Sequence, residues 1–210
     1  DSITVQDPGG GNPSTQAANL LKKIRGQRQV TVSVQGIGST ESANWVSGSA
    51  NLIAAKASMA AAGVTHVSIM LGTNDAIHGP FSSAVYQTNM LSLVNDLVGA
   101  GYTVILNYSP YCEPGSAGSV TTTEAMCDAL QGYQTVIDGI CNGTTILQGD
   151  KLAYRYFAEF QSESTDGIHP NATGGASLAL LWATAIDRAL NPAPAGTGGR
   201  LFINRTFSGV

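Results

Sequence analysis

Two nearly continuous apolar runs, 64–71 and 102–108, constrain the fold of this chain more than any other feature. Both have the length of a single strand, and such runs are typical of strands that are buried on both faces of a parallel sheet. Segments with helical spacing lie between and around them. Since strands that alternate with helices form a parallel sheet covered on both faces, the predicted fold class is α/β, a three-layer α/β/α sandwich with a mostly parallel central sheet.

The remaining pattern places strands and helices alternately along a single domain that spans residues 1–210. A further strand is predicted at 29–35, where Val30, Val32 and Val34 share one face, and a short one at 144–147. The carboxyl ends of the strands are where such sheets collect their functional residues. Helices are predicted at about 14–26 (capped by Ser14), 49–62, 82–100, 123–141, 151–161 and 173–190.

The composition narrows the class of partner. Hydrophobic residues make up 43% of the chain and charged residues 11%, and the net charge is -4 with no run of Lys or Arg. These values argue against nucleic acid or an anionic membrane as partner and favour a neutral small molecule or carbohydrate. No apolar run is long enough to span a bilayer, and we expect a soluble form from which any signal peptide has been removed, with a secreted or extracellular location favoured. The composition predicts no oligomeric state.

Three cysteines, Cys112, Cys127 and Cys141, allow at most one internal disulfide. If Cys127 and Cys141 share a helix, they lie about 20 Å apart, which is far beyond the reach of a disulfide. Cys112 would then be the partner of one of them, with Cys127 favoured. Three ordinary buried thiols are an equally compatible interpretation.

The turn Asp166-Gly167-Ile168-His169-Pro170 is the strongest chemical signal in the chain. Gly167 permits a tight bend and Pro170 disfavours helix before it, so Asp166 can fold back towards a ring nitrogen of His169. A carboxylate that accepts one imidazole N–H leaves the other nitrogen to accept a proton, which is what a general base requires. The alternative interpretation is a surface Asp-Gly turn followed by a histidine without a chemical role.

Such a sheet would gather four short motifs at one edge: Asp1-Ser2-Ile3-Thr4, Gly36-Ile37-Gly38-Ser39-Thr40, Gly72-Thr73-Asn74-Asp75 and Asp166-Gly167-Ile168-His169. Together they resemble the SGNH hydrolases, also called the GDSL esterase and lipase family. The resemblance extends over essentially the whole chain and implies a flavodoxin-like sandwich.

The resemblance implies a catalytic triad of Ser2 as nucleophile, His169 as base and Asp166 as the carboxylate that orients it. It also implies an oxyanion hole formed by the backbone N–H groups of Ser2 and Gly38 and the side-chain amide of Asn74. Gly36 is the alternative to Gly38, and a plain turn is the alternative at Asn74. No metal and no cofactor are expected.

The sequence departs from the family pattern at its start, because the family has a buried strand and a Gly directly before the Asp-Ser pair. The surplus apolar segment at 200–210 suggests a circular permutation, in which a C-terminal strand replaces the first strand and 191–199 is the linker. The alternative is an upstream truncation with an ordinary edge strand at the tail.

The predicted function is a serine esterase that cleaves short-chain carboxylic esters, with O-acetyl groups on carbohydrates preferred. Aromatic rings that follow the strands are expected to line a pocket that stacks on sugar rings. A non-catalytic carbohydrate-binding or structural domain of the same fold is the alternative. The pocket residues in this hypothesis are His78, Phe81, Tyr108 and Tyr111.

Overall fold

A parallel sheet forms the centre of the computed structural model, which describes residues 2–5, 12–24, 30, 32–78, 81–115 and 121–192, and of Ser2 the backbone alone. The strands β1 (His66–Met70), β2 (Thr103–Asn107) and β3 (Ile146–Gln148) pair in the order β1-β2-β3. Both pairings are parallel, with Met70 opposite Asn107 and Val104 opposite Ile146. The predicted α/β class with a parallel sheet is confirmed.

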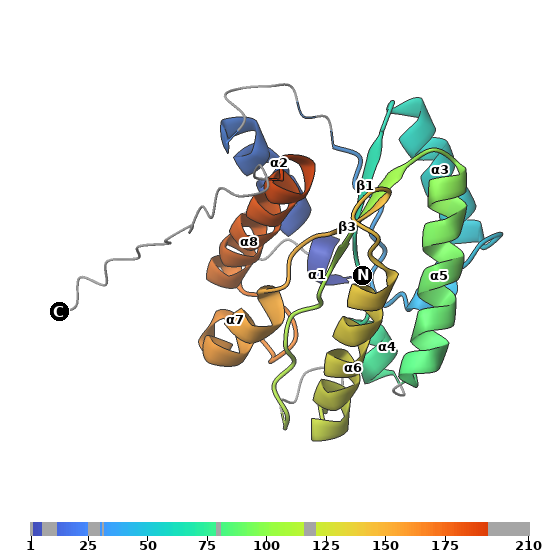
Figure 1. Ribbon diagram of the computed structural model, residues 1–210. Helices are drawn as coiled ribbons and strands as arrows, with labels where there is room; N and C mark the ends of the chain where they lie inside the picture. Colours follow the sequence, from blue (N-terminus) through green and yellow to red (C-terminus); the bar gives the residue numbers. More distant parts are fainter. Residues whose placement is uncertain are drawn as a thin grey trace.

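Helices cover both faces of this sheet, as Figure 1 shows. One face carries α1 (Ser2–Val5), α2 (Pro13–Ile24), α7 (Ala153–Glu159) and α8 (Ala172–Leu190). The other carries α3 (Ala50–Ala61), α4 (Thr73–Ile77), α5 (Ser83–Gly99) and α6 (Glu124–Ile140). Two short 3-10 turns, η1 (Ser42–Trp45) and η2 (Gln161–Glu163), complete the described elements.

Hydrogen bonds from capping side chains define the starts of several helices. Ser49 and Ser82 are N-caps whose side chains each accept a backbone N–H from the first turn of α3 and α5. Ser14 is not the cap that the sequence suggests, because α2 already begins at Pro13 and Asn12 accepts the N–H of Thr15. The hydroxyl of Ser14 instead donates to the carbonyl oxygen of Thr4 at 2.6 Å and so ties α2 to α1.

Two hydrophobic cores, one on each side of the sheet, hold the layers together. Trp45 belongs to the core under α3, α5 and α6, and Trp182 belongs to the core under α1, α2 and α8. The indole N–H of Trp182 donates to the hydroxyl of Ser68 on β1 at 2.6 Å. A buried tryptophan needs such a partner for its N–H, and here the partner fixes α8 against the sheet.

Asn107, the last residue of β2, links the ends of all three strands. Its Nδ2 donates to the carbonyl oxygen of Ile69 at 2.8 Å and to the hydroxyl of Ser68 at 2.9 Å. Its Oδ1 accepts the backbone N–H of Asp150, which follows β3, at 2.8 Å. Since Asn107 is 1% exposed, these bonds replace water that the amide has lost. These hydrogen bonds fix the carboxyl ends of β1, β2 and β3 relative to one another.

The strand predicted at 29–35 is wrong for the residues of that range that the structure describes, 30 and 32–35. Val32 and Val34 are exposed, and the segment lies across a cavity of about 560 Å³ from β1. A strand forms by hydrogen-bonded pairing with a neighbour, and among the described residues no strand pairs with this segment. Among the described residues, β1 is therefore an edge strand of the sheet. The prediction that its strand is buried on both faces is wrong at its start, because His66 is exposed.

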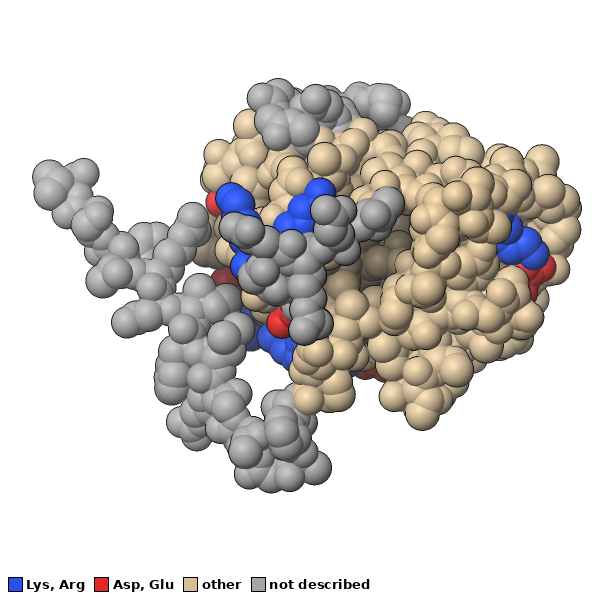
Figure 2. All heavy atoms as spheres, turned by 90° about the horizontal axis from the view of Figure 1, so that it is seen from above, with Lys and Arg blue, Asp and Glu red and all other residues tan. Residues whose placement is uncertain are grey.

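Residues 193–210 lie outside the described residues, so the predicted C-terminal strand and the circular permutation stay predictions. Among the residues that are described, no helix is both long enough and apolar enough to cross a membrane. Charged side chains are few on the face of the molecule seen in Figure 2, where they lie at opposite sides of the view with uncharged surface between them.

Gly174, in the first turn of α8, allows the helix to approach the backbone of η2. A Cβ at Gly174 would overlap the carbonyl oxygen of Glu163, whereas a Cβ at Gly139 on α6 would meet nothing within 4 Å. We expect Gly174→Ala to lower the free energy of unfolding by about 1–3 kcal/mol, because backbone cannot move aside as a flexible side chain can. Urea denaturation measures this. Gly139→Ala is the matched control and should leave stability unchanged or raise it by up to about 1 kcal/mol, because glycine loses more conformational freedom on folding than alanine; equal losses in both variants would contradict the close packing.

Candidate active site

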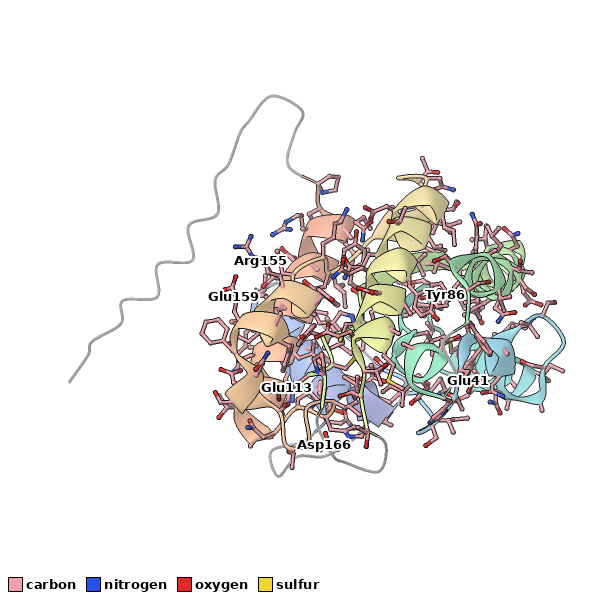
Figure 3. All side chains as sticks on the ribbon, turned by 90° about the horizontal axis from the view of Figure 1, so that it is seen from below. Glu41, Tyr86, Glu113, Arg155, Glu159 and Asp166 are labelled. Atoms are coloured by element: carbon pink, nitrogen blue, oxygen red, sulfur yellow. The ribbon has the colours of Figure 1, made fainter. Side chains whose placement is uncertain are left out.

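The candidate site lies at the carboxyl edge of the sheet, where α4 follows β1 and the segment Tyr108–Gly115 follows β2. Figure 3 views the molecule from this side and shows Glu113 and Asp166 on it. The backbone N–H of Glu113 donates to the carbonyl oxygen of Gly167 at 2.8 Å. The segment after β2 and the turn before α8 are therefore in direct contact.

Asp166 folds back onto His169, as the sequence predicts. Oδ2 of Asp166 lies 2.8 Å from Nδ1 of His169, and Oδ1 accepts the backbone N–H groups of His169 at 2.7 Å and Ile168 at 3.1 Å. Gly167 has a φ of +76°, which a residue with a side chain adopts at a cost. The side chains of His169 and Asp166 are 22% and 25% exposed, so a reactant can reach them.

The surroundings of Asp166 keep its carboxyl ionised. Burial alone would raise its pKa, but the hydrogen bonds from the backbone and ring of His169 and from the N–H of Ile168 outweigh burial and hold the pKa below its ordinary value. An ionised carboxylate at this position accepts a hydrogen bond from Nδ1 when that nitrogen carries the proton. The arrangement therefore favours the imidazole tautomer that leaves Nε2 as the basic nitrogen.

The turn that carries His169 is held at both of its ends. Ser164 and Pro170 form an antiparallel bridge, and the N–H of Thr165 donates to the carbonyl oxygen of His169 at 2.8 Å. Asn171 then caps α8 by accepting the N–H of Gly174 at 3.0 Å. The imidazole thus projects from a stretch of backbone whose position is fixed.

Asn74 lies in the first turn of α4 and is joined to the loop that contains Gly38. Its Nδ2 donates to the carbonyl oxygen of Thr40 at 3.1 Å, and the side chain is largely buried. The hydroxyl of Thr40 accepts the indole N–H of Trp45 at 3.0 Å and donates to the carbonyl oxygen of Ile37 at 2.8 Å. Asn74 and the Gly38 loop are therefore neighbours, while the choice between Gly38 and Gly36 stays a prediction.

Asp75 supports this loop and is the residue that sequence reasoning passed over. It is 1% exposed, and its carboxylate accepts the backbone N–H of Ser42 at 3.0 Å together with the hydroxyl of the same residue. Burial raises its pKa, and the hydrogen bonds from Ser42 offset part of that rise. The motif Gly72-Thr73-Asn74-Asp75 contained the signal, but its partner lies 33 residues earlier.

Ser2 is the first residue of α1, and its side chain lies outside what the structure describes. A hydrogen bond between its hydroxyl and His169 therefore stays a prediction. A nucleophile reacts only if it is held in line with its base. The described residues supply an anchor of their own, because Ile3 is 1% exposed and lies in the core with Met70 and Leu178.

The predicted aromatic pocket stays a prediction, and none of its four residues lines the cavity of about 560 Å³. Tyr108 is buried and donates its hydroxyl to Asp138 on α6 at 2.5 Å, so it packs the core and does not line a pocket. Tyr111 is half-buried and packs edge-on against Tyr154, with ring centroids 5.4 Å apart. His78 is exposed at the end of α4, 3.3 Å from Glu41. Phe81 is half-buried, and its carbonyl oxygen accepts the hydroxyl of Tyr133.

The sequence model of the GDSL-like lipase/acylhydrolase family matches residues 1–176 of this chain. No curated protein matches the chain in sequence.

Several solved structures are similar to this one in fold. The acetylxylan esterase Axe2 from Geobacillus stearothermophilus is 20% identical, with 91% of each chain covered and a TM-score of 0.65. A putative GDSL-like lipase from Parabacteroides merdae is 16% identical, with 89% of this chain and 92% of that chain covered and a TM-score of 0.65. The esterase EstA from Pseudoalteromonas sp. is 19% identical, with 91% and 95% covered and a TM-score of 0.62.

Removing the carboxylate of Asp75 tests its role under the loop. Asp75→Ala leaves the N–H of Ser42 buried without an acceptor, so the free energy of unfolding should fall by about 1–3 kcal/mol. Chemical denaturation measures the loss. The matched control is Asp128→Ala on the exposed side of α6, which should stay within about 0.5 kcal/mol of the unchanged protein. A loss no larger than that of the control would show that Asp75 does not support the loop.

The lowered pKa of Asp166 predicts a pH-dependent contribution to stability. A carboxyl whose pKa is lower in the folded than in the unfolded protein stabilises the fold above the unfolded value, near 3.9, and loses that contribution as the pH falls through the folded value. Unfolding free energies of the wild type and Asp166→Asn should thus differ by about 1.5 kcal/mol at pH 6 and converge towards pH 3. A constant difference from pH 6 to pH 3 would argue against an ionised Asp166.

Proposed function

Since the chain belongs to the GDSL-like lipase/acylhydrolase family and is an ester hydrolase, we propose that it cleaves short-chain carboxylic esters by a Ser2–His169–Asp166 triad and an acyl-enzyme. The observation that carries this proposal is the hydrogen bond between Asp166 and Nδ1 of His169. It orients the imidazole in the tautomer that a general base needs, on a turn whose backbone is held at both ends.

In the first half of the reaction, the hydroxyl of Ser2 attacks the carbonyl carbon of the ester and Nε2 of His169 takes its proton. The imidazolium that forms is stabilised by the ionised carboxylate of Asp166. It then gives the proton to the leaving alcohol, which departs as the acyl-enzyme forms. In the second half, His169 deprotonates a water that attacks the acyl group, and the acid is released as Ser2 regains its proton.

The negative charge on the tetrahedral intermediate is stabilised by hydrogen-bond donors from three segments of the chain. We assign these to the backbone N–H groups of Ser2 and Gly38 and to the amide of Asn74, each worth about 3 kcal/mol or slightly more. Asn74 is supported by its place beside the Gly38 loop, to which its hydrogen bond with Thr40 joins it. A neutral amide donates without forming an ion pair with the intermediate.

The proposed substrate class is the O-acetyl group on a carbohydrate. A neutral, polar substrate suits a chain in which only 11% of the residues are charged. One structural neighbour is an acetylxylan esterase, and Tyr111 offers a half-buried ring on the segment that touches the His169 turn. Aromatic rings are common packing surfaces for sugars.

Release of p-nitrophenol from p-nitrophenyl acetate tests the chemistry. Ser2→Ala and His169→Ala should lower kcat by about 10⁴-fold or more, and Asp166→Asn by about 10⁴-fold because it disturbs the tautomer of His169. Ser162→Ala, at an exposed serine of η2, is the matched control and should keep the wild-type rate. A Ser2→Ala variant that is as active as this control would exclude the proposed nucleophile.

Substrate class is tested separately, with acetylated xylo-oligosaccharides and with p-nitrophenyl esters of increasing acyl length. We expect acetate release from the oligosaccharides and a rate on the synthetic esters that falls beyond the shortest acyl chains. A rate that rises with acyl length, with no acetate released from the sugars, would keep the esterase and reject the carbohydrate substrate.

A further inference from the structure

Two buried cysteines face each other where the segment after β2 meets α6. Cys112 is 0% exposed and Cys127 is 4% exposed, and their sulfur atoms lie 3.7 Å apart. The thiol of Cys127 donates to the carbonyl oxygen of Cys112 at 2.8 Å. The third cysteine, Cys141, ends the same helix that carries Cys127, about 20 Å further along at 1.5 Å per residue. Only the first two are within reach of each other.

We propose that Cys112 and Cys127 form a disulfide that ties the segment after β2 to the first turns of α6. Bonded sulfurs lie about 2.05 Å apart, so the two sulfur atoms have to approach each other by less than about 2 Å. The contact is formed by residues 15 positions apart, a spacing that turns the intervening chain into a closed loop. The inference does not depend on the proposed hydrolase chemistry.

The bond requires an oxidant, and a low-molecular-weight disulfide such as oxidised glutathione supplies it. One cysteine thiolate attacks the oxidant and forms a mixed disulfide with release of one glutathione thiol. The second thiolate displaces the other glutathione and closes the bond between Cys112 and Cys127. The two cysteines lose two protons and two electrons in total, and the oxidant is reduced to two thiols.

Burial fixes when this exchange can take place. It raises the pKa of Cys112 to about 12 and also raises that of Cys127, so few thiolates exist once the core has closed. The exchange therefore belongs to folding, while both thiols still meet solvent. After folding, the same burial shields the bond from reductants.

The position of Cys112 gives the bond a consequence for the candidate site. The next residue, Glu113, donates its N–H to Gly167 in the turn that carries His169. A covalent tie at Cys112 therefore anchors the segment that supports the imidazole. The same bond reduces the freedom of the unfolded chain, and a loop of about 15 residues is long enough for a measurable gain in stability.

Alkylation and mass spectrometry test the connectivity. The whole chain is refolded with oxidised glutathione, unfolded without reductant, alkylated with iodoacetamide and digested. We expect one alkylated cysteine, Cys141, and one cross-linked peptide pair that contains Cys112 and Cys127. Three alkylated cysteines, or a cross-link that includes Cys141, would overturn the proposal. This measurement uses the wild type, so it does not depend on whether a variant folds.

The melting temperature tests whether the disulfide between Cys112 and Cys127 stabilises the fold. Wild type that is unfolded and refolded in the presence of reductant should melt about 6–12 °C below the oxidised wild type, from the loop length and the size of the chain. Cys141→Ala, the matched control, should show the same fall. Cys127→Ala should melt at the same temperature with and without reductant. Equal melting temperatures for the oxidised and reduced wild type would overturn the proposed tie.

Discussion

The amide of Asn107 is the interaction on which the candidate site depends, because it holds the carboxyl ends of three strands at one level. Its two ends bond to β1 on one side and to the residue after β3 on the other. The neighbouring Gly149 leaves room for this, since a Cβ there would overlap the oxygen of Asn107. The loops after β1, β2 and β3 therefore start from fixed points. A buried amide without these partners would cost about 1–3 kcal/mol.

The chain has few charges, and three of its aspartates serve mainly to hold backbone. Asp75 accepts from Ser42, Asp150 accepts the N–H groups of Leu152 and Ala153, and Asp166 accepts those of Ile168 and His169. Burial raises the pKa of Asp75 and Asp150, whereas hydrogen bonds lower that of Asp166 despite its burial. Of these three carboxyls, the one whose pKa is lowered is therefore the one beside the imidazole.

How much the sequence could predict depended on how local each interaction is. The helices 50–61 and 83–99 followed from apolar spacing, and the contact of Asp166 with His169 spans only three positions. The strand at 29–35 was wrong because alternation shows that a segment could pair, not that a partner lies beside it. The support that Asp75 gives to Ser42 and the burial of Tyr108 against Asp138 join residues 33 and 30 positions apart. Only the folded chain brings such residues together.

The two tryptophans of the chain lie in different cores, and this gives the protein a pair of optical reporters. The indole of Trp45 donates to Thr40 beside Asn74, while that of Trp182 donates to Ser68 and so senses the docking of α8 on β1. Fluorescence from single-tryptophan versions would follow the two faces of the sheet separately. If the two fluorescence transitions coincide during unfolding, the layers separate in one cooperative event, and if they differ, the layers separate in steps.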